Sequence, residues 1–239
     1  MPTEFPRLRK QFLKRFAEEL APLGFKKSDQ FYYRRTFYGK DIIHATFVAH
    51  PGHHFEVNLS IGVRHDAVEN IVLEFLTDYP KDLVTWSVTV GNRLDNLLLD
   101  FNTIEDIINK SVSWVISDEN DLEEELQSIM RMVHDFILPY FQRFSSLEET
   151  LNVLSANDRE STRHHSRSAG WGAMDAVAAA FVRGDRNRFE EVVEQKIQYL
   201  AQIPLPNPQI DKLMPVFRAL VENLRRRWDV KEPCLKEIN

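Results

Sequence analysis

Residues 31–64 decide the fold, and they read FYYRRTFYGKDIIHATFVAHPGHHFEVNLSIGVR. The last ten alternate apolar and polar side chains, which is typical of a strand with one buried face. Two earlier stretches, 31–38 and 43–49, alternate in the same way, and the short connections YGKD and PGHH separate the three. Parallel strands would need long crossovers, so we expect these strands to form an antiparallel β-meander.

Helices are predicted before and after this meander in the sequence. Residues 5–20 place apolar side chains at helical spacing, with a basic polar face. Further on, TWSVTVG predicts a fourth strand over 86–90, SVSWVIS fits either a last strand or a helix end, and Leu122–Phe141 repeats apolar residues at three and four. The sequence therefore predicts an α+β fold with a four- or five-stranded antiparallel sheet, covered by the first helix and by Leu122–Phe141.

The later part of the chain predicts a separate helical region. The segment SANDRESTRHHSRSAG holds no apolar residue larger than Ala, so we expect residues 156–168 to be a linker or mobile loop. Three helical stretches follow, two of them joined at Gly184-Asp185 as a helical hairpin. The predicted organisation is an α+β domain over 1–155 and a C-terminal helical hairpin or bundle over 169–239.

Composition limits the function classes. The 239 residues carry 28% charged side chains, no apolar run long enough to cross a membrane, and one cysteine, Cys234. A single cysteine excludes an intrachain disulfide and a cysteine-based zinc cage, so we expect a cytoplasmic protein. Nucleophile elbows and phosphate loops are also missing from the sequence, and we expect no cofactor and no catalytic residue.

Charge is distributed unevenly along the chain. Residues 1–40 carry ten Lys/Arg and four Asp/Glu, whereas residues 41–143 carry six and eighteen, a net charge of −12. We expect this acidic region to bind an unknown protein partner, which the chain would regulate or neutralise, although solubility alone would also explain the charge. The candidate contact residues lie at a predicted helix start: Glu119, Asp121, Glu123 and Glu124.

Two other functions stay open as alternatives. Tyr32, Arg34 and Tyr38 share one side of their strand and could bind RNA or another ligand, since RNA-binding sheets stack bases on aromatic rings. The acidic segments that follow would repel phosphate, which argues against nucleic acid. The other alternative is a metal-dependent hydrolase, built on the histidine turn His50, His53 and His54.

The order of these motifs resembles a known family. A first helix, then LGFKKS, FYYRR, VNLSIG, a tryptophan strand, and a helix ending in ILPYF before SLEETLNVL is similar to the bacterial domain-of-unknown-function family 4304. The resemblance covers roughly residues 5–155. It implies the same α+β fold and brings no catalytic residue with it.

Overall fold

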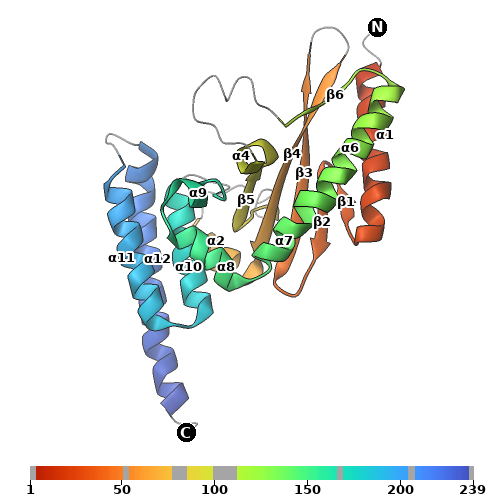
Figure 1. Ribbon diagram of the computed structural model, residues 1–239. Helices are drawn as coiled ribbons and strands as arrows, with labels where there is room; N and C mark the ends of the chain where they lie inside the picture. The colour runs from red at the N-terminus through yellow and green to blue at the C-terminus, as the bar shows by residue number, and fades with distance from the viewer. Residues whose placement is uncertain are drawn as a thin grey trace. The chain divides into compact units, whose positions relative to one another are not determined.

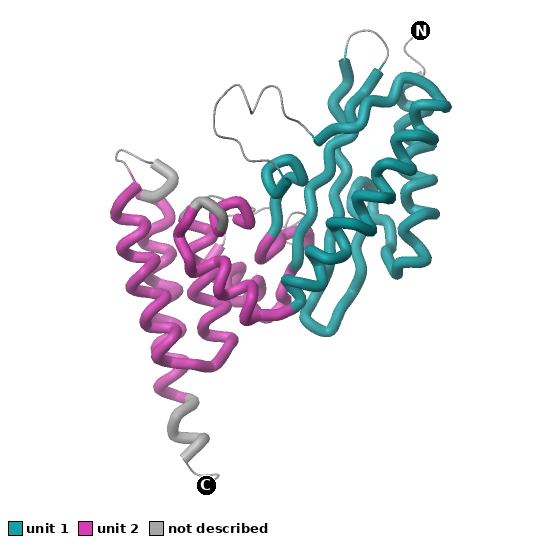
Figure 2. The backbone as a smooth tube through the Cα atoms, in the orientation of Figure 1, with its two compact units in different colours: residues 1–63, 91–145 teal, residues 64–90, 146–239 magenta. Residues whose placement is uncertain are grey.

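The computed structural model describes residues 4–50, 54–76, 85–98, 112–165, 169–203 and 208–236. The chain forms two compact units (Figure 2), and each is described by itself. Unit 1 comprises residues 1–63 and 91–145, and unit 2 comprises residues 64–90 and 146–239.

Unit 1 is built on an antiparallel sheet (Figure 1). Within the described ranges the sheet has six strands in the order β1-β2-β3-β4-β5, and β6 also pairs with β4. This confirms the predicted α+β fold. The strands are β1 (Lys26–Ser28), β2 (Phe31–Arg35), β3 (Gly39–Ala49), β4 (Phe55–His65), β5 (Val90–Arg93) and β6 (Trp114–Ile116).

Some strand boundaries differ from the prediction. The segment YGKD is not the turn itself, because β3 already begins at Gly39 and Asp41 lies opposite Arg34 in the ladder. The fourth strand was predicted at 86–90 and instead occupies Val90–Arg93. The SVSWVIS stretch forms strand β6, which resolves the alternative that the sequence left open.

One face of the sheet is covered by helices. α1 (Glu4–Leu20) leads through a short 3₁₀ turn, η1 (Ala21–Leu23), into β1, and its apolar side is buried. Aromatic rings join the two layers, with Phe12 edge-on to Phe47 of β3 and Phe16 edge-on to Tyr32 of β2. α1 also packs against α6 (Glu119–Met132), and α6 packs against β6, so both helices predicted to cover the sheet contact it. The short helix α4 (Leu94–Leu98) follows β5.

The predicted helix over Leu122–Phe141 is longer and has a π-helical turn. α6 begins after Asp118, whose side chain accepts hydrogen bonds from the backbone N–H groups of Asn120 and Asp121. It continues as a π-helical turn, η2 (Val133–Ile137), and then as α7 (Leu138–Phe144). Pro139 has no backbone N–H to donate, and it lies just after the wide turn, so the helix passes it without ending.

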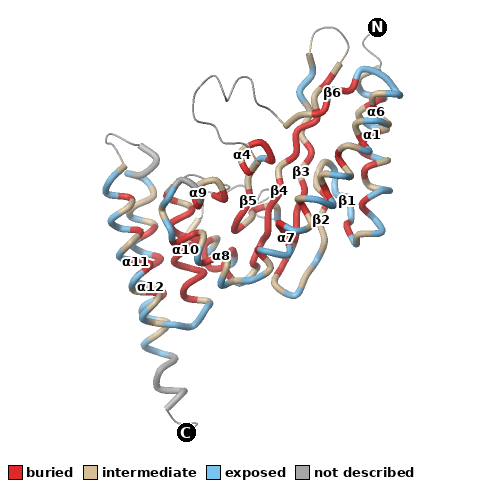
Figure 3. The backbone as a smooth tube through the Cα atoms, in the orientation of Figure 1, coloured by how far each residue is buried: buried red, intermediate tan, exposed pale blue. Residues whose placement is uncertain are grey.

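Unit 2 is helical and is organised around one buried helix. α10 (Ala169–Arg183) packs against four other helices, and its described residues are buried from Ala173 to Phe181 (Figure 3). A helix that is apolar on every side belongs in a core. The surrounding helices are α2 (Asp66–Leu73), α8 (Leu147–Ser155), α11 (Arg186–Ala201) and α12 (Pro208–Lys236).

The division into units differs from the predicted domains. Residues 64–90 and 146–155 lie in the helical unit, because α2 and α8 both bury their apolar sides against α10. The predicted linker is also not solvated over its described part. It contains the helical turn α9 (Arg159–Thr162), and Ser161, His164 and His165 are all buried. Residues 166–168 lie outside the described ranges.

Candidate functional site

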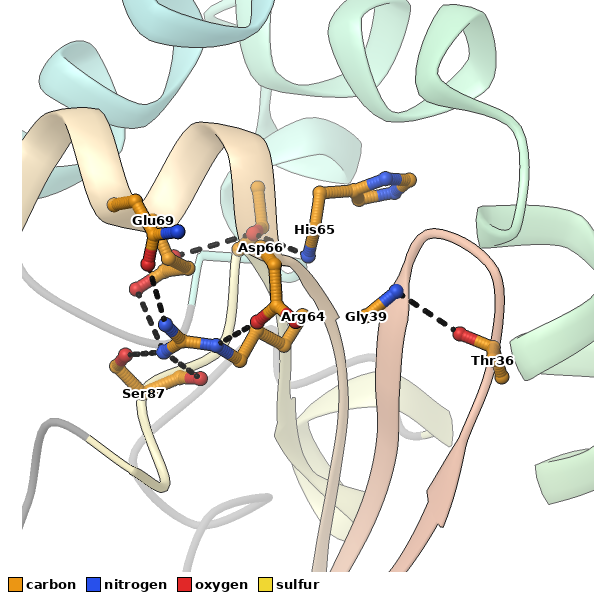
Figure 4. Close-up of polar contacts among 9 residues, drawn as sticks. Thr36, Gly39, Arg64, His65, Asp66, Glu69 and Ser87 are labelled. Atoms are coloured by element: carbon orange, nitrogen blue, oxygen red, sulfur yellow. Dashed lines mark hydrogen bonds and ion pairs between the residues drawn. The ribbon is translucent and has the colours of Figure 1, made fainter.

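The turn between β2 and β3 carries the most exposed aromatic ring of the described chain. Phe37 is 96% exposed. The turn is closed on both sides of it, since the Thr36 N–H donates to the Gly39 carbonyl at 3.0 Å and the Gly39 N–H donates to Thr36 Oγ1 at 3.1 Å (Figure 4). Gly39 has φ 150°, a value that glycine adopts without strain. We call residues 36–39 the hairpin tip.

A buried carboxylate, that of Asp41, binds two side chains next to the hairpin tip. Asp41 is fully buried in β3, and its Oδ2 accepts hydrogen bonds from Nε and Nη2 of Arg34 at 3.0 and 2.7 Å. Its other oxygen, Oδ1, accepts from the Tyr38 hydroxyl at 2.6 Å. Burial, together with the hydrogen bond to Asp41, raises the pKa of Tyr38, so the phenol stays protonated as a donor.

We call Asp41 with its two donors, Arg34 and Tyr38, the brace. Arg34 also connects the brace to the helical layer. Its Nη1 donates to the Leu23 carbonyl at 3.3 Å, and its guanidinium lies over the Phe25 ring at 5.1 Å. Charged groups with several fixed partners lose little mobility on binding. The brace therefore fixes the Tyr38 side of the tip, and among the aromatic rings of the described residues Phe37 meets the edge of Tyr38, at 5.1 Å between ring centroids.

The predicted ligand surface of Tyr32, Arg34 and Tyr38 is wrong in one residue. Tyr32 is fully buried under α1, and its hydroxyl donates to the Leu13 carbonyl at 3.1 Å. Its ring cannot stack on a base. Arg34 and Tyr38 do come together, as structural partners of Asp41, and they support the exposed Phe37, which was not among the predicted site residues.

The predicted acidic surface is partly neutralised within unit 1. Arg7 of α1 pairs with Glu119 at 2.6 Å, and Arg15 pairs with Glu123. The hydrogen bond from Arg15 lowers the pKa of Glu123. These pairs join the basic segment at the start of the chain to the acidic segment that follows. Part of the opposite charge of the two segments is therefore neutralised where α1 packs against α6.

The other acidic residues of α6 form a separate group. Asp121 accepts a hydrogen bond from the Ser117 N–H at 2.9 Å, and Glu124 is exposed. Glu125 lies beside both, and burial followed by the charges of Asp121 and Glu124 raises its pKa. Crowding of like charges on this side of α6 leaves an acidic surface of Asp121, Glu124 and Glu125.

The histidine turn is described only in part. His50 Nε2 lies 3.1 Å from Glu56 Oε1, and the His50 and His54 rings are stacked at 5.1 Å. His53 lies outside the described residues. Within the ranges that are described, no three His, Cys, Asp or Glu side chains come together as metal ligands would. A site that uses His53 stays a prediction.

A larger polar network lies in unit 2, where β4 passes into α2 (Figure 4). Arg64 Nε donates to Asp66 Oδ1 at 2.6 Å, and its Nη1 donates to Ser87 and lies 3.8 Å from Glu69 Oε2. His65 Nε2 lies 3.1 Å from the Thr150 hydroxyl. Glu69 and Thr150 are fully buried, and Arg64 and His65 nearly so. Burial of these four groups is typical of a structural network, and the partly exposed Asp66 lies at its edge.

A second buried group in unit 2 surrounds Lys196. This lysine is fully buried, donates to Asn157 Oδ1 and lies over the Tyr199 ring at 5.4 Å. Burial lowers the pKa of Lys196 to about 8. Burial also lowers the pKa of His165 to about 4, helped by the charges of Lys196 and His164. Sequence reasoning missed this group, because a helical lysine and two histidines in a polar stretch are typical of solvent-exposed positions.

Comparisons with protein-family models, with curated proteins and with solved structures found no match. The resemblance to domain-of-unknown-function family 4304 therefore stays a prediction from the sequence. No helix in the described parts of the chain combines the length and hydropathy needed to cross a bilayer.

Proposed function

We propose that this chain is a non-catalytic binding protein that recognises a protein partner, which it regulates or neutralises, with the hairpin tip at the centre of the contact. Phe37 carries this proposal. Leaving a phenylalanine side chain in water forgoes about 1.5–3 kcal/mol of burial. An interface with a partner would recover this free energy.

The brace distinguishes Phe37 from an ordinary exposed apolar residue. Single exposed apolar side chains are common and need no explanation. At the hairpin tip, however, the buried Asp41 accepts hydrogen bonds from Arg34 and Tyr38. These hydrogen bonds fix the turn that carries the ring. Hot spots of interfaces are enriched in aromatic anchors, and a preorganised anchor loses less entropy on binding.

The acidic surface of Asp121, Glu124 and Glu125 is a second candidate contact, for a basic partner. Its support is the proximity of the three carboxylates, because burial first, and then the charges of Asp121 and Glu124, raise the pKa of Glu125. Of the four residues first predicted there, Glu119 and Glu123 are paired with α1, so Glu124 and Asp121 remain the candidates. We place the protein in the bacterial cytoplasm, from its low cysteine content and the family resemblance.

A capture experiment tests the proposed function. Wild-type protein, Phe37→Ala and the matched control Val48→Ala are immobilised and exposed to lysate of the source cell. Val48 is also an exposed apolar residue of unit 1, at 46%, and it lies near the opposite end of β3. We expect one or more proteins to bind wild type and Val48→Ala and to be lost with Phe37→Ala. Equal capture by all three would refute the role of the hairpin tip, and turnover of a substrate would refute the non-catalytic part.

A further inference from the structure

We propose that residues 157–165 of unit 2 form a closed segment that opens on acidification, with protonation of the buried His165 as the trigger. We call these residues the latch segment. The inference goes beyond the proposed function and does not depend on the hairpin tip. It rests on the contacts that close the segment, on the packing of the His165 ring, and on the cation beside that ring.

The latch segment is closed by polar contacts. The Ser161 N–H donates to Asp158 Oδ1 at 2.6 Å, and the His164 and His165 N–H groups donate to the Ser161 and Thr162 carbonyls at 3.0 and 3.2 Å. The segment reads NDRESTRHH and contains no apolar residue. Because the hydrophobic effect contributes little to its closure, it can open at a lower free energy than the apolar core around α10.

Lys196 of α11 holds the start of the latch segment. Its ammonium donates to Asn157 Oδ1, and Asn157 has φ 52°, a left-handed conformation that asparagine tolerates better than most residues. Lys196 is fully buried, and burial lowers its pKa to about 8. At neutral pH the lysine is therefore charged inside the protein, which costs free energy that opening would recover.

The His165 ring packs against α10. A Cβ added at Gly172 would lie 2.7 Å from His165 Nδ1, so the ring lies on the helix backbone where no side chain has room. Lys196 of α11 and His164 of the latch segment are the charges that act on it, and α10 also carries the buried Asp175, three residues beyond Gly172. Burial first, and then these two cations, lower the pKa of His165 to about 4.

Protonation of His165 favours the open segment. A histidine in water titrates near 6.5, whereas His165 in the closed segment binds a proton only near pH 4. Between these pH values the open segment binds more protons, so closure is stable at neutral pH and is lost as the pH falls. Lys196 is protonated in both states below about pH 8 and does not contribute to this change.

Opening changes the surface that unit 2 presents. It uncovers the ammonium of Lys196 and the side of α10 at Gly172, both of which are buried when the segment is closed. A neutral side chain at position 165 would close the segment equally at every pH. The histidine, placed beside a buried lysine, makes closure depend on pH.

Hydrogen exchange of the full chain measures the opening. Protection factors, which remove the intrinsic pH dependence of exchange, are compared at pH 7.5 and 5.5 for the amides of Thr162, His164 and His165. We expect them to fall about tenfold on acidification, and to be lower at both pH values than the protection of Val177 in the core of α10. Unchanged protection, or protection equal to that of Val177, would overturn the inference.

His165→Gln removes the titrating ring, and His134→Gln is the matched control because His134 is exposed in unit 1. We expect the tenfold fall to disappear in the first variant and to persist in the second. The same fall in both variants would overturn the role of His165. An NMR titration of the wild-type His165 ring tests the proposal without any variant. We expect the ring to stay neutral down to about pH 5, and a midpoint near the ordinary value of 6.5 would overturn the inference.

Discussion

In unit 1 the buried Asp41 is bound by Arg34 and Tyr38, next to the turn that carries the exposed Phe37. In unit 2 the buried Glu69 faces Arg64 within a polar network. Both regions bury a carboxylate beside an arginine. They differ in what the ion pair holds in place, which is a turn that carries Phe37 in unit 1 and the junction between β4 and α2 in unit 2. A buried ion pair alone is therefore a poor indicator of a binding site, and the exposure of the residue that it supports is the better one.

The largest effect that we predict breaks the network of unit 2. Arg64→Met removes the cation and leaves the buried Glu69 carboxylate without it, so we expect the unfolding free energy to fall by about 3–5 kcal/mol. Chemical denaturation measures this change. The double variant Arg64→Met/Glu69→Leu removes both charges and should recover part of the loss. A double variant as unstable as the sum of the two single ones would contradict the pairing.

The next effect concerns the buried lysine of unit 2 and appears as a pH dependence. Burial lowers the pKa of Lys196 from 10.5 to about 8, so between these pH values the unfolded chain binds more protons than the folded one. Stability should therefore rise with pH over this window, by about 3 kcal/mol in total. Denaturation curves at a series of pH values measure the rise.

Lys196→Met supplies the control for that rise. This variant has no ammonium group to bury, so it should be more stable than wild type near neutral pH and should lack the increase above pH 8. The same increase in both proteins would show that other groups cause it, and Lys196 would then be solvated in the folded state.

A smaller effect should follow from breaking the brace of the hairpin tip. Asp41→Asn weakens the hydrogen bonds from Arg34 and Tyr38, and Arg34 is partly exposed to water, so we expect a loss of about 1–3 kcal/mol. Hydrogen exchange should accelerate at the amides of Thr36 and Gly39, which close the turn. Unchanged exchange there would mean that the turn is rigid without the brace.

The smallest effect belongs to the charge pairs between α1 and α6. Arg7 and Glu119 are both 57% exposed, and we expect Glu119→Gln to change the unfolding free energy by less than about 1 kcal/mol, and by less still at high salt. Glu124→Gln is the control, since Glu124 is exposed on the same helix. A loss of several kcal/mol on Glu119→Gln alone would show that this pair fixes the position of α1.

The meander could be predicted because its signals are local. Alternation over Phe55–Val63 and the short connections on either side specify antiparallel strands without knowledge of the rest of the chain. The side of β2 that α1 covers is not a local property. Aromatic residues occupy both sides of this strand, Phe31 and Tyr33 on one and Tyr32 on the other, and only packing against Phe16 decides between them.

The candidate site was predicted less well for a related reason. Phe37 continues the apolar and polar alternation of β2, so periodicity assigns it to the strand, although Gly39 two residues later provides the signal for a turn. The burial of His165 and Lys196 is likewise invisible in the sequence, because a polar side chain enters the core only when the surrounding helices supply its contacts.

The most direct test of the central claim measures stability and binding on the same variant. Phe37→Ala removes a ring that is 96% exposed, so we expect its unfolding free energy to stay within about 0.5 kcal/mol of wild type. Its affinity for the protein that the wild type captures from lysate should nevertheless fall at least about tenfold, as for an aromatic anchor at an interface centre. Unchanged affinity at unchanged stability would contradict the claim that the hairpin tip presents Phe37 to a partner.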